Sequence, residues 1–286
     1  MRDLRPRKCP ISGETESVRI FRYTEAPAGE IGFRRPAGEP YLREIWQFTG
    51  SNHFVSRHAM KVATGYGGDY VDATYGGMDG MKAAFDRVVA LPASESDNAG
   101  RLERIRAFAE ARFPLPQLVR LLDVGAGLGV FPHAARRIGW DCTAIDPDQR
   151  AVEHIEERAF VTAVCADFIT VGDIGRFDIL TFNKVLEHFE DPVAMLYRAQ
   201  HFLSPRGFVY IELPDGEMAA AEGAGREEFF IEHLHIFSFA STVMLADRAG
   251  FAAVQVERLR EPSGKFSLRA FAIRSAAEGK RPKTGD

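Results

Sequence analysis

The sequence LLDVGAGLGVF, residues 121–131, decides the fold class of this chain. A run of apolar, strand-forming residues leads into Gly125, Gly127 and Gly129 and then into a helical pattern. Glycine permits positive φ angles and lets a ligand approach the backbone closely, so this segment predicts a strand, a tight glycine loop and a helix beside a bound ligand. Taken alone, such a turn does not distinguish a dinucleotide site from a simple tight turn.

Two details of this loop separate the candidate ligands. The glycine spacing is GxGxG, whereas the dinucleotide fingerprint is GxGxxG with the pyrophosphate on the helix N-terminus. Asp123 ends the strand just before the glycines, where its carboxylate would repel a pyrophosphate but suits a ligand with an ammonium and a sulfonium group. S-adenosylmethionine (SAM) carries both groups, so the loop favours SAM over NAD.

The pattern on both sides of the loop predicts an α/β fold. Short apolar runs alternate with helical patterns, which is typical of βαβ units in a parallel sheet. Strands are expected at 119–124, 140–145, 161–166, 177–182 and 207–213, and helices at 99–113, 130–138, 148–158, 192–203 and 241–249. The final runs, FAAVQVERL and FSLRAFAI, are separated by turn-forming residues and predict an antiparallel hairpin at one edge. The expected fold is Rossmann-like: a doubly wound, mostly parallel sheet with a C-terminal hairpin.

The N-terminal third has a different character. Residues 1–98 are rich in Gly, Pro and aromatic residues with weak periodicity, including GYGGDYVDATYGGMDG at 65–80. This composition predicts an irregular and helical lid or substrate-specificity region. A SAM-binding domain is then expected at 99–276, followed by a disordered tail at 277–286.

Composition excludes several classes of protein. The 286 residues carry a formal net charge of −4, with a pI near 6.1, and lack the basic face of a general nucleic-acid binder. No apolar run approaches the ~18 residues of a membrane span, and none follows the basic N-terminus as in a secretory signal. We expect a cytoplasmic protein with a small-molecule substrate and no nucleic-acid or membrane partner; the oligomeric state stays open.

The cysteines give no sign of a metal site. There are 3 cysteines, and Cys9, in CPISGE, has no second cysteine nearby. Zinc takes about four protein ligands in structural sites, so a zinc knuckle at Cys9 would be incomplete. We therefore expect no metal.

Acidic residues follow the next two predicted strands. Asp146 ends the second strand, where a carboxylate can accept hydrogen bonds from both ribose hydroxyls, although Asp146 and Pro147 can also simply cap the next helix. Asp167 follows the third strand and is a candidate acceptor for the adenine amino group, with Phe168 packing on the ring. The fourth strand leads into Asn183 and VLEHFEDP, at the carboxyl edge where α/β sheets bind ligands.

Together, the glycine loop, Asp146, Asp167 and the VLEHFEDP segment resemble class I SAM-dependent methyltransferases over about residues 118–274. The resemblance implies that Gly125, Gly127, Asp146 and Asp167 contact SAM and that Asn183 lies near its methionine part or the substrate. The segments IELPDGE and EEFFIEHLHIFS are similar to methyltransferases of the sugar and small-metabolite type, which often carry an N-terminal zinc knuckle that is absent here. The implied activity is methyl transfer to oxygen or carbon of a small polar acceptor, with a nucleotide-activated sugar as one such acceptor.

A hydroxyl or carbon nucleophile needs a base, and histidine is the usual one near neutral pH. The candidates are His188, just after the fourth strand, and His233 and His235 in EHLHIFS. In an extended segment these last two would point to the same side, with Glu212 and Glu232 as candidate orienting carboxylates. Each histidine can instead be a structural loop residue.

Two other functions are compatible with the same sheet. An NAD-dependent oxidoreductase is disfavoured by Asp123 and the glycine spacing. A non-catalytic SAM-binding module would bind SAM without methylating any acceptor. RNA methylation is weakened by the absence of a basic stripe.

Overall fold

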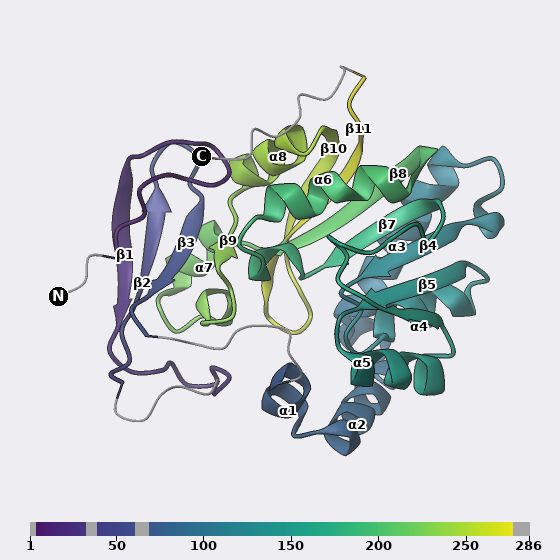
Figure 1. Cartoon of the computed structure of the whole chain (residues 1–286), viewed down its shortest axis with the longest axis horizontal. Helices are drawn as coiled ribbons and strands as arrows, with labels where there is room; N and C mark the ends of the chain where they lie inside the picture. The colour runs from purple at the N-terminus through teal and green to yellow at the C-terminus, as the bar shows by residue number, and fades with distance from the viewer. Residues whose placement is uncertain (1–3, 33–38, 61–68, 277–286) are drawn as a thin grey trace.

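The computed structural model describes residues 4–32, 39–60 and 69–276, and these residues form two sheets (Figure 1). The larger sheet has the strand order β10-β11-β8-β7-β4-β5-β6, and the smaller has the order β1-β2-β3-β9. The strands of the larger sheet are β4 (Arg120–Val124), β5 (Asp141–Asp146), β6 (Thr162–Cys165), β7 (Phe177–Asn183), β8 (Leu203–Pro214), β10 (Phe251–Arg260) and β11 (Phe266–Arg274). Those of the smaller are β1 (Ser17–Tyr23), β2 (Arg43–Phe48), β3 (Phe54–His58) and β9 (His235–Ile236).

The larger sheet confirms the predicted Rossmann-like fold. Strands β4, β5, β6, β7 and β8 pair in parallel, whereas β10 and β11 form an antiparallel hairpin whose inner strand pairs with β8. The chain moves outward from β4 to β6 and then returns to β7 on the other side of β4. The order of the strands therefore reverses between β4 and β7, and such a switch point opens a crevice at the carboxyl ends of the strands.

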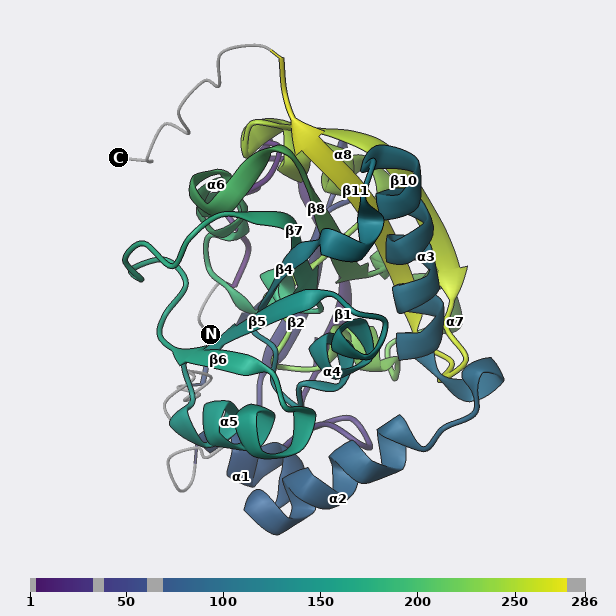
Figure 2. The ribbon, with the colours of Figure 1, turned by 90° about the vertical axis from the view of Figure 1, so that its right-hand side faces the viewer.

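Helices cover both faces of this sheet (Figure 2). They are α3 (Asp97–Arg112), α4 (Val130–Arg137) and α5 (Gln149–His154) toward one face, and α6 (Pro192–Phe202) and α8 (Phe239–Arg248) on the other. Side chains of strand β8 point alternately to the two helical layers. Its Phe208 and Tyr210 pack in the cluster that contains Ile105 of α3, and Val209 and Ile211 pack in the cluster of α6 and α8.

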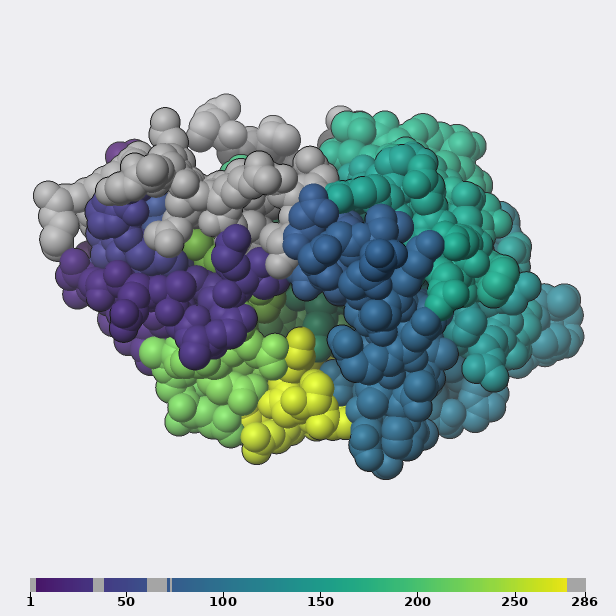
Figure 3. Space-filling model, turned by 90° about the horizontal axis from the view of Figure 1, so that it is seen from below, coloured from purple at the N-terminus to yellow at the C-terminus, as the bar shows by residue number. Residues whose placement is uncertain are grey.

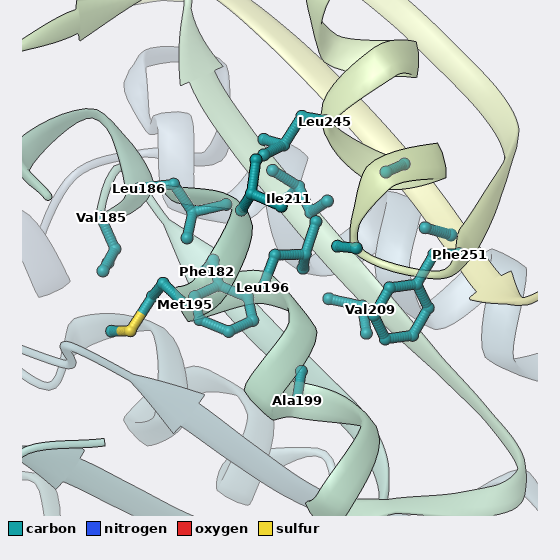
Figure 4. Close-up of a cluster of buried hydrophobic side chains, with 14 of the residues drawn as sticks. Phe182, Val185, Leu186, Met195, Leu196, Ala199, Val209, Ile211, Leu245 and Phe251 are labelled. Atoms are coloured by element: carbon teal, nitrogen blue, oxygen red, sulfur yellow. The ribbon is translucent and has the colours of Figure 1, made fainter. Parts of the chain in front are cut away.

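The core between β7, β8, α6 and α8 fixes the position of the loop after β7 (Figure 4). Phe182, on β7, and Leu196, on α6, are fully buried there. Val185 and Leu186, which follow β7 directly, belong to the same cluster. The loop that carries VLEH is therefore anchored by its own apolar residues.

The N-terminal region contains a sheet that the sequence prediction missed. Strands β1, β2 and β3 pair in antiparallel fashion, and β3 also pairs with β9, the two-residue strand just before α8. Strand β2 includes Arg43, which is fully buried with its guanidinium on Glu30. Because charged residues are buried here, the alternation that would have indicated a strand is hidden.

The glycine-rich run at 65–80 was expected to contain irregular loops and short helices. Residues 61–68 lie outside the described part, and the rest forms α1 (Asp69–Tyr75) and α2 (Met78–Val89). Gly76 and Gly77, with φ angles of 70° and 101°, form the turn between the two helices. The predicted tail at 277–286 also lies outside the described residues.

Candidate functional site

The glycine loop lies at the switch point between β4 and β7. Gly125 and Gly129 have positive φ angles, and a Cβ on either would come within 2.9 Å of Val185 or Ile155, so close packing excludes a side chain. Gly127 has a φ of 50°, but a Cβ there would meet nothing within 4 Å. The space beside Gly127 is thus open, which is what close approach of a ligand to the backbone requires.

Asp146 connects this loop to the end of β5. Its Oδ2 accepts a hydrogen bond from the Gly127 amide at 3.0 Å, and its Oδ1 accepts one from the Asp148 amide at 3.0 Å. Burial raises the pKa of Asp146 above its ordinary value, although both amides favour the ionised form. Two bonds from the backbone hold the carboxylate in one orientation at the edge of the loop.

Two neighbouring cavities share Gly125 and Val185 in their linings. The first, here called the loop cavity, has a volume of about 70 Å³, and the second, the Phe168 cavity, about 220 Å³. The loop cavity is lined by Val71, Tyr75, Met81, Gly125, Gly127, Asp146, Asp148, Ala151, Lys184, Val185 and His188. The Phe168 cavity is lined by Val124, Gly125, Ile145, Pro147, Ala166, Asp167, Phe168, Val185, Phe189 and Met195. Together they approach the lower size limit of small-molecule sites, roughly 300 Å³.

Helices α1 and α2 close the loop cavity from the N-terminal side. Val71, Tyr75 and Met81 belong to these helices, and no signal in the sequence singled out Val71 or Met81. Figure 3 shows a hollow between the purple N-terminal strands and the blue helices, with green and teal atoms in its depth. A larger hollow of about 730 Å³ lies beside α3, near the amino ends of β4 and β5 and away from the carboxyl ends of the parallel strands, and its lining includes exposed residues such as Glu103. We therefore place the site at the glycine loop.

The predicted cofactor residues divide into two groups. Gly125, Gly127, Asp146, Asp167 and Phe168 line the cavities. Asp123, Gly129 and Asn183 are not among the lining residues of either cavity.

Asp123 and Asn183 form a buried layer behind the loop. Asp123 Oδ1 accepts hydrogen bonds from Thr181 Oγ1 at 2.6 Å and from Asn183 Nδ2 at 2.8 Å. Burial raises the pKa of Asp123 to about 7. The other amide atom of Asn183, Oδ1, is buried and has no hydrogen-bond partner among the described residues. Asp123 therefore orients Asn183. The prediction that Asp123 itself faces the ligand has no support, because Asp123 lines neither cavity.

Two of the three predicted histidines lie together. The rings of His188 and His233 are 5.1 Å apart between centroids, and one nitrogen of each lies within 4.8 Å of the other and of a Glu187 carboxylate oxygen. His188 Nδ1 contacts the Glu232 carbonyl and His233 Nδ1 the Glu228 carbonyl, each at 2.9 Å. Burial lowers the pKa of both imidazoles and raises the pKa of Glu187 to about 8.

Glu212 and Glu232 were expected to orient the histidines through their carboxylates, and the structure shows another arrangement. Backbone carbonyls orient both rings instead. Glu212 is fully buried and binds Arg101, and although burial alone would raise its pKa, the guanidinium holds that pKa well below the usual range. Sequence reasoning missed Glu187; its place in VLEH beside His188 was the available signal.

His235 lies apart from the other two histidines, contrary to the expectation that it shares a side with His233. Residues 231–234 form turns and a bend rather than an extended segment. His235 Nδ1 lies 3.1 Å from His53 Nε2, and its Nε2 lies 3.4 Å from the Glu190 carbonyl. Burial lowers the pKa of His235 to about 4. It links the N-terminal sheet to the loop before α6 and does not line the loop cavity.

Comparison with known proteins identifies the family. The profile of a family described as "Methyltransferase domain" matches residues 94–256. The chain belongs to this methyltransferase family. Its glycine loop, Asp146 and the loop after β7 all lie inside the matched segment.

Curated relatives include the ubiquinone biosynthesis O-methyltransferases of Xanthomonas campestris pv. campestris and Caulobacter vibrioides. The first is 32% identical over 111 residues, 36% of this chain and 46% of the relative. The second is 30% identical over 128 residues, 40% of this chain and 51% of the relative. The chain thus spans about half the length of the curated relatives it matches.

Two solved methyltransferases share the fold. Magnesium protoporphyrin IX methyltransferase from Synechocystis PCC 6803, with bound S-adenosylhomocysteine (SAH), is 16% identical and gives a TM-score of 0.55 over 73% of this chain and 98% of that chain. The 1,6-didemethyltoxoflavin-N1-methyltransferase of Burkholderia thailandensis is 19% identical, with a TM-score of 0.53 over 86% of this chain and 100% of the other. The methyltransferase family thus has the Rossmann-like fold seen here and uses SAM as its cofactor.

The described residues fit SAM. The backbone at Gly127 faces open space, Asp146 offers a fixed carboxylate, and the Phe168 cavity provides an apolar recess next to both. The family match does not favour the NAD-dependent alternative. Among the described residues, no helix is long and apolar enough to cross a membrane.

Proposed function

We propose that this methyltransferase transfers the methyl group of SAM to a hydroxyl oxygen of a small acceptor. One observation carries the proposal: Gly127 and Asp146, the best candidates to hold the cofactor, share the lining of one cavity with His188, which belongs to the Glu187, His188 and His233 cluster. Cofactor groups and groups able to act on an acceptor thereby border the same space.

In this proposal each loop residue has a separate task. Gly127 lets the cofactor approach the backbone, and Asp146 accepts hydrogen bonds from the ribose hydroxyls. Asp167 and Phe168 hold the adenine in the Phe168 cavity. Asn183, oriented by Asp123, presents its buried amide oxygen toward the methionine part.

When bound, SAM supplies a methyl group on a sulfonium whose departure leaves a neutral thioether. The protein therefore need not protonate a leaving group. Its tasks are to align the acceptor oxygen and either to remove the hydroxyl proton or to stabilise the resulting negative charge. His188, which lines this cavity, suits the second task, and Glu187 and His233 lie beside it.

The relatives support oxygen rather than carbon as the acceptor atom, because the curated names printed for them are O-methyltransferases. A phenolic hydroxyl is our first choice of acceptor. The nucleotide-activated sugar implied by the sequence resemblance is the second, and residues 1–98 are proposed to select between such acceptors. The pairing of β3 with β9 supports the proposed role of residues 1–98 in acceptor selection. Strand β3 lies in this region, and β9 begins two residues after His233.

Calorimetric titration with SAM and, separately, with NAD tests the cofactor, using wild type and Asp146→Ala. We expect wild type to bind SAM only and the variant to lose that binding. SAH release with a panel of catechols, phenols and nucleotide sugars then tests the reaction. Binding of NAD without SAM would refute the proposal, and SAM binding with no turnover on any acceptor would favour the non-catalytic module.

A further inference from the structure

Lys184 occupies a strained backbone position directly after β7. It is one of three described non-glycine residues with a positive φ angle, here 59°. L residues rarely adopt this left-handed conformation, and the surrounding structure must hold it where they do. The Lys184 amide donates a hydrogen bond to the Glu212 carbonyl at 3.0 Å, which holds the turn against β8. Strained positions of this kind cluster at functional sites.

The side chain of Lys184 ends in an ammonium group whose hydrogen-bond donors are free. Its nitrogen, Nζ, lies 3.7 Å from Glu212 Oε1, beyond hydrogen-bond distance, and donates to no other atom of the described residues. That carboxylate already accepts hydrogen bonds from Arg101 and Tyr210 and is ion-paired with Arg269. An ammonium group has three donors, so Lys184 retains donors for a ligand.

This ammonium group borders the space assigned to the reactants. Lys184 lines the loop cavity, and 27% of its side-chain surface is accessible, whereas the neighbouring Glu212 side chain has 0% accessible. The cofactor candidates Gly127 and Asp146 belong to the ends of β4 and β5. Lys184 and His188 instead follow β7, on the side that carries the groups proposed to act on the acceptor.

The charges around Lys184 favour an anionic oxygen over a neutral hydroxyl. Burial lowers the pKa of His188 and of His233, so neither imidazole holds a proton readily near neutral pH. Burial raises the pKa of Glu187 to about 8, so its carboxyl group is mostly protonated at neutral pH and adds little negative charge. Burial also lowers the pKa of Lys184, but the Glu212 carboxylate opposes this change and favours the ammonium form.

We propose that the Lys184 ammonium group binds the ionised oxygen of the methyl acceptor and is a catalytic residue for phenolic acceptors. This inference rests on the proposed O-methylation. The acceptor hydroxyl loses its proton to water, and Lys184, which stays protonated, donates a hydrogen bond to the resulting oxyanion. An oxygen lone pair then forms the O–C bond while the C–S bond breaks, and the electron pair of that bond stays on sulfur.

The same chemistry selects the class of acceptor. A phenol ionises in water with a pKa of about 10, and a nearby cation lowers that pKa by about 1–3. A sugar hydroxyl ionises far less readily, so one ammonium group does not produce a useful fraction of its anion near neutral pH. Lys184 therefore favours phenols over the nucleotide-activated sugar.

The first test uses a phenol whose ionised form is coloured, so it needs no turnover. 4-Nitrophenol is titrated into the full chain in the presence of SAH, and the absorbance of the bound phenolate is followed against pH. We expect the pKa of the bound probe to lie about 1–3 below that of the free probe in wild type. Lys184→Met should abolish this lowering, and Lys184→Arg, which keeps the charge, should retain it.

Lys265 provides the matched control. Its positive charge also acts on Lys184, but it is paired with Glu227 at 3.1 Å and is not among the residues that line the loop cavity. Lys265→Met should therefore keep the wild-type pKa of the bound probe. Arg101 lowers and Asp97 raises the pKa of Lys184 as well, and both residues are unchanged in every variant.

Turnover and cofactor binding give the second test. With a phenol as acceptor, Lys184→Met should lose about 100-fold to 1,000-fold in kcat, while its affinity for SAM by calorimetry is not reduced. Lys184→Gly removes the ammonium group and also relieves the positive φ, so it should be at least as stable as wild type in thermal melts. It gives the same test should Lys184→Met fail to fold.

Several outcomes overturn the inference. They are the absence of bound phenolate in wild type, an unchanged pKa of the bound probe in Lys184→Met, and an equal effect in Lys265→Met, which would indicate a general field. A loss of SAM affinity in Lys184→Met would assign the ammonium group to the cofactor carboxylate instead. Phenol turnover at the wild-type rate in Lys184→Met refutes the role of Lys184 and leaves the proposed O-methylation intact. Phenolate binding without turnover of any phenol does the reverse.

Discussion

Gly127→Ala should separate cofactor binding from folding. Gly127 and Gly139 both have positive φ angles, 50° and 97°, and a Cβ on either meets nothing within 4 Å. A non-glycine residue in the left-handed region costs about 1–2 kcal/mol, and each kcal/mol shifts the Tm of a chain of this size by about 2–4 °C. Both substitutions should therefore lower Tm modestly and to a similar extent.

The two variants should differ in SAM affinity, because only Gly127 lines the loop cavity. A methyl group there occupies the space that we assign to the cofactor, and overpacking of this kind costs about 1–3 kcal/mol, or roughly 5-fold to 150-fold in Kd. Calorimetry with SAM and SAH measures this effect, with Gly139→Ala as the matched control. Wild-type SAM affinity in Gly127→Ala, or an equal loss in Gly139→Ala, would refute our placement of the cofactor.

Three further predictions concern the layers around this loop. The Asp146 carboxylate accepts hydrogen bonds from two backbone amides, and Asp146→Asn places an NH₂ donor against one of these N–H groups. We therefore expect SAM affinity, measured by calorimetry, to fall about 10-fold to 100-fold. Asp123, whose pKa burial raises to about 7, stabilises the fold fully at acidic pH and loses that contribution as pH rises through 7. Wild type should thus lose about 1 kcal/mol more than Asp123→Asn in urea unfolding between about pH 6 and about pH 8; Glu187, whose pKa burial raises to about 8, titrates in both proteins and cancels in the comparison. Arg43→Met leaves the buried Glu30 carboxylate without its ion pair and should cost about 3–5 kcal/mol, against about 0.5 kcal/mol or less for the exposed Arg106→Met, both measured by urea unfolding.

The parallel sheet was predictable because its signals are local. Glycines that need positive φ, apolar runs of strand length and acidic residues at strand ends all appear within short stretches of sequence. The predicted strand at 161–166 is found as β6, and the predicted hairpin as β10 and β11. The cofactor cradle follows from the same signals, since Gly127 and Asp146 meet wherever β4 and β5 are neighbours in parallel.

The acceptor side was less predictable because tertiary contacts decide it. His233 and His235 were expected to point the same way, but the turn at residues 231–234 sends them to different partners, His188 and His53. Glu187 becomes informative only once its burial is known. No local pattern reports that β3 will pair with β9.

That pairing links the N-terminal sheet to the chemistry of the site. Residues 228–238 contain three contacts of this kind. The Glu228 carbonyl orients His233, and the β9 residues pair with β3. The Ser238 hydroxyl donates a hydrogen bond to the Ser51 carbonyl and caps α8. A displacement of the N-terminal sheet must therefore move the segment that positions His233. The cofactor cradle, built from β4, β5 and their loops, has no such connection through hydrogen bonds among its described residues. Changes on the β3 side of this pairing should accordingly alter acceptor kinetics while SAM affinity is unchanged, which is the behaviour of a specificity region.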